Sequence, residues 1–259
     1  MKKIEWKPWT KHVFYTENDP ETDRPCIGYV QGRERAVLLD AGNSPLHAKL
    51  MQEGLAAQGL PMPDMVCLTH AHWDHTYGLA GWNSLSLAGK KTNEILRQMQ
   101  SWKWDEEAMA ERLRRGEDSL FCDIHIRKEY PDRSQIQVQS ANLAFTGEVD
   151  LALGGVTVCL REIVSPHGED CVVMLIPEDG VLFLGDAYCS VPMGEDWVYD
   201  PIRLQLFLQA LEEIPFTTAI KGHHPPQSKE ELLTELTAEL SAETAETAEK
   251  EAQHGKGTD

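Results

Sequence analysis

Short apolar runs separated by turn residues occupy the first part of the chain and return after residue 143. The early runs are "HVFYT", "CIGYVQG", "RAVLLDAG" and "MVCLTH", and the later ones are "LAFT", "GVTVCLREIV", "CVVMLIP", "GVLFLGDA" and "TTAIKG". Glycine, proline and aspartate punctuate them, as in "GLPMPD", "SPHGED" and "PEDG". Runs of this length between such breakers are typical of buried β-strands. The pattern therefore predicts a chain built largely from short strands.

Two other stretches repeat apolar residues at helical spacing. Residues 45–58 open with Pro45, which is favoured in the first turn of a helix, and they predict one helix. Residues 91–115 predict the longest helix within the body of the chain, and Trp102 and Trp104 are interpreted there as packing groups. Residues 119–140 are mixed in pattern and receive no assignment.

The last thirty residues differ in character from the rest. They repeat glutamate with threonine and alanine, and only their first half carries regularly spaced leucines. That half is predicted to form a surface helix, and the remainder is predicted to be frayed or disordered. We expect a domain over residues 1–227 followed by an acidic helix or tail over residues 228–259.

Composition narrows the class of protein. The chain has 259 residues, 41% of them hydrophobic, with a formal net charge of −18. The acidic balance argues against nucleic acid held by charge, and it leaves small neutral or cationic substrates open, with anionic ones requiring a metal. No signal peptide or membrane span is visible. The six cysteines are scattered without a C-x-x-C pair, as expected of a reduced, cytoplasmic protein.

The segment "THAHWDH" concentrates candidate ligands directly after the apolar run "MVCL". Strand alternation lets His70 and His72 point the same way, and Asp74 and His75 can face the same space from the loop beyond them. Zinc takes imidazole and carboxylate ligands gathered from such short spacings. A metal site is therefore favoured over a set of hydrogen-bonded surface residues.

Further candidates follow other apolar runs, where loops can converge. They are Asp40 after "AVLL", His167 after "REIVSP", Asp186 after "VLFLG" and His223 after "TTAIKG". Each alone is weak, since an aspartate after a strand is usually a turn or cap residue. Together they turn a local cluster into a distributed site.

Taken in order, "LLDAG", "THAHWDH", "SPHG", "LGDA" and "KGHH" resemble the five motifs of the metallo-β-lactamase superfamily, from about residue 12 to 227. The resemblance implies an α+β fold, a four-layer αββα sandwich, with residues 88–140 as a helical insertion between the second and third motifs. It also implies two metal sites. His70, His72 and His167 would hold one ion, and Asp74, His75 and His223 the other, with Asp186 bridging. Zinc is expected, with iron or manganese as alternatives.

Three details qualify the match. Asp40 would orient the histidine loop without binding metal itself. Pro166 stands where the family's third motif usually has glycine before the histidine, which alters the expected loop path at His167. His224 competes with His223 for the last ligand position, and the glycine before His223 favours His223.

A metal-bridged hydroxide would attack the substrate, with Asp74 as the catalytic group that accepts or relays its proton. Tyr188 and Tyr77 are candidate proton donors to the leaving group, although packing roles are more common, and Cys189 could border the site. The leading prediction is a hydrolase of a small-molecule ester, thioester or lactone. A mononuclear iron persulfide dioxygenase, a phosphodiesterase of the same fold and a non-catalytic binding protein are the alternatives. Residues 88–140 would line the substrate pocket or form a homodimer contact, and the sequence does not decide between the two.

Overall fold

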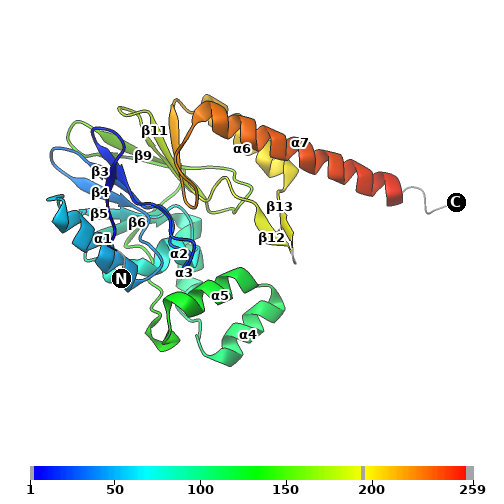
Figure 1. Cartoon of the computed structure of the whole chain (residues 1–259), viewed down its shortest axis with the longest axis horizontal. Helices are drawn as coiled ribbons and strands as arrows, with labels where there is room; N and C mark the ends of the chain where they lie inside the picture. The colour runs from blue at the N-terminus through cyan, green and yellow to red at the C-terminus, as the bar shows by residue number, and fades with distance from the viewer. Residues whose placement is uncertain (1–2, 194–195, 255–259) are drawn as a thin grey trace.

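Two β-sheets packed face to face form the centre of the protein in a computed structural model that describes residues 3–193 and 196–254 (Figure 1). The first sheet has seven strands, hydrogen-bonded in chain order: β1 (Lys7–Pro8), β2 (Val13–Tyr15), β3 (Gly28–Gln31), β4 (Ala36–Leu39), β5 (Met65–Cys67), β6 (Leu85–Gly89) and β7 (Leu143–Phe145). Strands β1 to β4 are antiparallel, and β4 to β7 are parallel. The parallel half therefore brings the ends of β4 and β5 to one edge of the sheet.

The second sheet has six strands and is mostly antiparallel. In spatial order they are β15 (Gln227–Ser228), β14 (Thr218–Lys221), β11 (Val181–Gly185), β10 (Val172–Ile176), β9 (Thr157–Glu162) and β8 (Glu148–Ala152). Strands β11 and β14 run parallel, so their carboxyl ends also lie together. A separate hairpin of β12 (Val191–Met193) and β13 (Asp196–Val198) extends from this half.

Alternating side chains explain why the strands read as continuous apolar runs. In β10, Met174 faces the core between the sheets, whereas its neighbours Val173 and Leu175 face the helices on the outer side. Leu38 and Leu39 of β4 divide in the same way between the outer and inner cores. Successive strand residues point to opposite faces, so a strand covered on both faces must be apolar throughout.

Helices cover both outer faces and complete the predicted αββα sandwich. Helices α1 (Pro45–Ala57) and α3 (Lys90–Met99) pack on the first sheet through residues such as Met51 and Leu96. Helices α6 (Pro201–Glu213) and α7 (Lys229–His254) cover the second sheet through Phe207, Leu232 and Leu236. The predicted helix over residues 45–58 is confirmed, whereas α6 was not foreseen.

The expectation of one long helix over residues 91–115 is wrong. The chain forms two helices there, α3 and α4 (Glu106–Arg115), because Asp105 caps α4 by accepting a hydrogen bond from the backbone N of Ala108 at 2.9 Å. Residues 119–140, left unassigned, contain α5 (Leu120–Glu129) and the 3₁₀ turn η2 (Arg133–Gln135). Figure 1 shows α4 and α5 apart from the two sheets.

The acidic tail begins as the predicted helix, and α7 continues to His254, further than its leucines predict. Residues 255–259 lie outside the described part of the chain. The division into residues 1–227 and 228–259 stays a prediction. Within residues 3–193 and 196–254, no helix has the length and apolar character needed to cross a bilayer.

Candidate metal centre

The predicted ligands meet where strands end. The histidine loop follows β5 and contains the single-turn helix α2 (Trp73–Thr76). His167 lies in the loop between β9 and β10, Asp186 directly follows β11, and His223 follows β14. Because β4 and β5 are parallel, as are β11 and β14, these loops emerge at a common edge of the two sheets.

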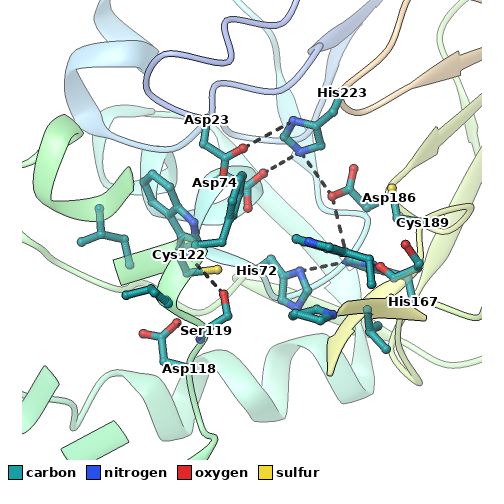
Figure 2. A pocket seen from close by; sticks show the side chains of 18 of the residues that line it. Asp23, His72, Asp74, Asp118, Ser119, Cys122, His167, Asp186, Cys189 and His223 are labelled. Carbon is teal, nitrogen blue, oxygen red and sulfur yellow. Dashed lines mark hydrogen bonds and ion pairs between the residues drawn. The ribbon is translucent and has the colours of Figure 1, made fainter. Parts of the chain in front are cut away.

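All seven predicted ligands come together, in two groups whose members' nitrogen or oxygen atoms lie within 4.8 Å of one another. Figure 2 shows five of them: His72, Asp74, His167, Asp186 and His223. The first is an all-histidine group: His70, His72 and His167. The second contains two carboxylates: Asp74, His75, Asp186 and His223. In the first group, Nε2 of His167 lies 3.0 Å from Nδ1 of His72.

Asp186 lies between the two groups. Its Oδ1 is 3.4 Å from Nε2 of His75, and its Oδ2 is 3.2 Å from Nε2 of His223. The same Oδ2 is 3.9 Å from Nε2 of His167, which belongs to the all-histidine group (Figure 2). Asp74 closes the second group, with Oδ2 3.1 Å from Nε2 of His223. A carboxylate in this position suits a bridge between two cations.

Three polar atoms of the cluster are buried and make no hydrogen bond in the described part of the chain: Nε2 of His70, Nε2 of His75 and Oδ1 of Asp186. The last two have ion-pair contacts only, with Nε2 of His75 3.0 Å from Oδ2 of Asp74 and 3.4 Å from Oδ1 of Asp186. Burying such atoms unsatisfied costs about 1–3 kcal/mol each. A bound cation would satisfy them, since imidazole nitrogens and carboxylate oxygens are the ligands zinc prefers. The donor set therefore fits a divalent metal.

The two groups differ in the charge that their histidines carry near pH 7. Burial alone would raise the pKa of Asp186, but His223 and His75 outweigh it and hold that pKa well below its usual range. Burial would likewise lower the pKa of His75, but the carboxylates around it raise that pKa well above its usual range. In the all-histidine group, burial and the neighbouring rings instead lower the pKa of His167 to about 4. Its imidazole is therefore neutral near pH 7, with a nitrogen lone pair free to bind metal.

Asp40 supports the histidine loop from behind. Its backbone has a positive φ of 71°, a conformation that aspartate and asparagine adopt more readily than most residues. The carboxylate accepts a hydrogen bond from the backbone N of Thr69 at 2.7 Å and contacts Nδ1 of His75 at 2.7 Å. Nδ1 of His75 therefore donates to Asp40, and Nε2 faces the cluster.

The two sequence details that qualified the match do not disturb the cluster. With Pro166 before it, His167 still lies within the first group, and its backbone N donates to Oγ of Ser165 at 3.0 Å. His224 lies outside the cluster, with its Nδ1 2.6 Å from the hydroxyl of Tyr188. The side chain of His223 belongs to the cluster instead.

Glycine before His223 leaves room for the carboxylate of Asp186. A Cβ added at Gly222 would lie 2.0 Å from Oδ1 of Asp186, far inside contact distance. The sequence interpretation favoured His223 because of this glycine, and the geometry supplies the physical reason.

Two neighbours of the cluster had no signal in the sequence. Asp23 has a positive φ of 54°, and its Oδ1 lies 3.6 Å from Nδ1 of His223. Burial, followed by the nearby Asp74, raises the pKa of Asp23 to about 7. The backbone oxygen of Ser190 lies 3.4 Å from Nδ1 of His167. Both contacts join segments far apart in the chain, and no motif marks either residue.

A cavity of about 1070 Å³ opens onto the cluster. His72, Asp74, His167, Asp186 and His223 form part of its lining. Tyr77, Tyr188 and Cys189, all singled out from the sequence, also line it, together with residues of α4, α5 and the β12–β13 hairpin. The part of the 88–140 segment that borders the cavity therefore includes α4 and α5, which pack on Trp73 and Tyr77.

Comparison with known proteins identifies the family. The sequence matches the Metallo-beta-lactamase superfamily over residues 27–243, most of the chain. A search of curated proteins found no match.

Solved structures share the fold at low sequence identity. A metallo-β-lactamase family protein from Thermus thermophilus is 19% identical, with a TM-score of 0.63, over 90% of this chain and 80% of that one. A subclass B3 metallo-β-lactamase of Bradyrhizobium japonicum is 15% identical, with a TM-score of 0.62, over 97% and 96% of the two chains. A sec-alkyl sulfatase has a TM-score of 0.69 at 15% identity, and the match spans 98% of this chain but 44% of that one.

Proposed function

Because the chain belongs to the metallo-β-lactamase superfamily, we propose that it is a dinuclear metal-dependent hydrolase of a small-molecule ester, thioester or lactone. The observation that carries the proposal is the pair of ligand groups joined by Asp186. A site for a single ion would need only one of these groups.

We assign each ligand to one of two ions according to the group in which it lies. His70, His72 and His167 would hold one ion, and Asp74, His75 and His223 the other, with Asp186 shared. Zinc is the proposed metal, because neutral imidazoles and carboxylates are its usual ligands besides thiolates. Bound divalent metals lower the pKa of coordinated water and polarise the substrate carbonyl.

Asp74 is the proposed proton acceptor of the reaction. Burial alone would raise its pKa, but His75 and His223 outweigh that effect and lower it, so Asp74 is ionised at neutral pH and can receive a hydrogen bond from the attacking water. Water oxygen forms a bond to the carbonyl carbon and the carbon–oxygen or carbon–sulfur bond breaks. The proton that water loses is then available to the leaving group.

Tyr188 is within reach of the substrate space, since it lines the cavity two residues after Asp186. Its hydroxyl contacts Nδ1 of His224 at 2.6 Å, so the phenol is held in a fixed orientation. Tyr77 is fully packed against Trp104 and Trp73, with ring centroids 5.6 and 6.3 Å away. Both tyrosines predicted as proton donors line the cavity and are buried, and we favour Tyr188 because it lies two residues after Asp186.

We place the enzyme in the cytoplasm. All six cysteines are free, and four of them are buried. Buried free thiols are usual in reducing compartments, where disulfides do not persist.

The test is hydrolysis by metal-replete protein of a panel of esters, thioesters and lactones, compared with an Asp74→Asn variant. We expect turnover by the unaltered protein and a loss of about 100-fold or more in the variant, since a positioned base contributes that much. Asp132→Asn, at an exposed aspartate beside η2 that does not line the cavity, is the matched control. Turnover that survives Asp74→Asn would refute the role of Asp74. Oxygen uptake with a persulfide and no ester hydrolysis would favour the iron dioxygenase.

A further inference from the structure

The outer part of the cavity has two apolar walls from different parts of the chain. One wall comes from α4 and α5 and includes Leu113, Phe121 and Ile126. The other comes from the β12–β13 hairpin and includes Pro192 and Trp197. Figure 1 shows the hairpin and these helices as elements outside the two sheets.

Phe121 and Trp197 join the two walls. Their ring centroids are 5.8 Å apart and the rings are perpendicular, at 89°. Both side chains remain partly exposed, at 42% and 52%. Covering such an exposed aromatic surface with an apolar ligand favours binding, because it removes apolar area from water.

Apart from the histidines, the charged residues that line the cavity are all acidic. Among the described residues that line it, none is lysine or arginine. Outside the metal cluster, the lining includes four acidic residues: Asp23, Glu117, Asp118 and Glu235. Glu117 and Asp118 lie between α4 and α5, next to the apolar wall.

The guanidinium of Arg112, on α4 beside this wall, does not line the cavity, although its Nε and Nη2 have no hydrogen-bond partner in the described part of the chain. It lies over the rings of both Trp102 and Trp104, at 4.6 Å from each centroid, and its Nη1 donates to the backbone oxygen of Lys103. Its Nε is 3.9 Å from Oδ2 of Asp118. With only 5% of its surface exposed, Arg112 is not available to an anionic substrate.

We propose that the substrate carries an uncharged, apolar acyl group, which lies against the joined rings of Phe121 and Trp197 while its carbonyl reaches the metal cluster. The inference rests on the proposed hydrolase function and adds the chemistry of the substrate. Each methylene buried there strengthens binding by roughly fourfold. A carboxylate, sulfate or phosphate on that group would meet Glu117 and Asp118, and no lysine or arginine among the described residues lines the cavity to pair with it. Arg115 contacts Glu117 from outside the lining, at 3.7 Å between Nη1 and Oε1.

The first experiment compares three p-nitrophenyl esters that differ only at the end of a hexanoyl chain: a methyl group, a carboxylate or an ammonium. We expect kcat/KM for the methyl ester to exceed that for the carboxylate by about 100-fold, because like charges would meet in a confined space. The ammonium ester is expected between the two. Equal kcat/KM for the methyl and carboxylate esters would overturn the inference.

Substitutions test the two walls separately. Phe121→Ala and Trp197→Ala should each raise KM for the hexanoyl ester by about fivefold or more, with a smaller effect on the acetyl ester, because the longer chain loses more buried surface. Met62→Ala is the control, since Met62 is 48% exposed and does not line the cavity. An unchanged KM for hexanoyl ester in both wall variants would contradict the proposed position of the acyl group.

Charge reversal tests the acidic wall. Glu117→Lys should improve kcat/KM for the carboxylate ester by about tenfold, because it places a cation beside the chain end. Glu107→Lys makes the same change at an exposed residue of α4 outside the cavity lining, and it should have no such effect. A response of equal size to both changes would mean that the overall charge of the protein, and not the cavity wall, sets the preference.

Binding separates failure of this inference from failure of the hydrolase proposal. The anilides of the same three acyl chains resist hydrolysis, and their affinities can be measured by calorimetry on the full chain, with metal present and after chelation. If no ester is hydrolysed but hexananilide binds about tenfold or more tightly than its carboxylate analogue, the cavity inference holds and the hydrolase proposal fails. If the two anilides bind equally after chelation, the cavity inference fails whatever the esters show.

Discussion

Asp40 and His75 form a contact of 2.7 Å between Oδ2 and Nδ1, and neither side chain is exposed. The pair lies behind the metal cluster, because the other nitrogen of His75 is the one that faces Asp186. Asp40 also accepts from the backbone and hydroxyl of Thr69, which precedes His70. One carboxylate thus orients a ligand and the loop that carries three further ligands, His70, His72 and Asp74.

Asp40→Asn is expected to weaken metal affinity by about 10- to 100-fold, as loss of a carboxylate that supports a ligating histidine usually does. Asparagine tolerates the positive φ at this position, so the fold should be retained. Affinity is measured by competition with a chelator, alongside circular dichroism. Asp64→Asn is the matched control: Asp64 accepts from the backbone N of Ala36, at the other end of β4 from Asp40. A normal metal affinity in folded Asp40→Asn protein would contradict the role given to this contact.

Gly222→Ala should impair metal binding while leaving most of the fold intact, because the new Cβ would displace the carboxylate of Asp186. Gly59→Ala provides the contrast. Gly59 has a positive φ of 69° but open space around it, so alanine there should lower the free energy of unfolding by about 1 kcal/mol without affecting the metals. Metal content and urea unfolding of both variants separate the two effects. Full metal occupancy in Gly222→Ala would show that the site accommodates the added methyl group.

We expect the contact that Asp179 makes with Thr10 and His12, between the two sheets, to be lost at acid pH. The carboxylate, in the turn after β10, accepts hydrogen bonds from Oγ1 of Thr10 and from the backbone N of His12 at 3.1 Å. Burial alone would raise its pKa, but these hydrogen bonds outweigh burial and lower it. The folded pKa is thus below the unfolded value of about 3.9, so the contact stabilises the fold above that pH and is lost as pH falls through the folded pKa.

Asp179→Asn should lower the free energy of unfolding by about 1.5–3 kcal/mol at pH 7, the range for hydrogen bonds to a charged group. The difference from the unaltered protein should shrink below about pH 4, where the native carboxylate also loses its charge. Urea unfolding at pH 7, 5 and 3 measures this, with Asp196→Asn as an exposed control. A difference that does not change with pH would mean that the charge of Asp179 is unimportant.

Leu236 links the acidic tail to the second sheet, since it is fully buried in the core formed by α6, α7 and that sheet. Leu236→Ala should lower the free energy of unfolding by about 2–5 kcal/mol, the usual loss when a buried leucine leaves a cavity. Leu206→Ala on α6 is the control, because Leu206 is 46% exposed. Equal stability of the two variants would show that α7 adds little to the fold.

Features carried by local sequence were predictable. The strand runs, the helix after Pro45 and the histidine loop each depend on residues close together in the chain. Asp40, His167, Asp186 and His223 could be found because each follows a strand, and the family resemblance ordered them. The structure places His223 in the cluster and leaves His224 on Tyr188.

Features that depend on tertiary contact were not predictable. The break between α3 and α4 is of another kind: Asp105 caps α4 by accepting from the backbone N of Ala108, three residues along the chain, and the apolar repeat, which runs across this local signal, does not show it. Asp23 reaches His223 across two hundred residues of chain without any motif around it. The opposition of Phe121 and Trp197 arises because two segments outside the sheets meet beside the cavity, and periodicity carries no information about such a meeting.

The most direct test of the dinuclear account is the metal content per chain of gently purified protein, determined by elemental mass spectrometry together with an Asp186→Ala variant. We predict two divalent ions per chain, with zinc foremost, and fewer than two in the variant, because Asp186 lies within reach of both ligand groups. A single iron per chain in the unaltered protein, or two ions that persist in Asp186→Ala, would contradict the account.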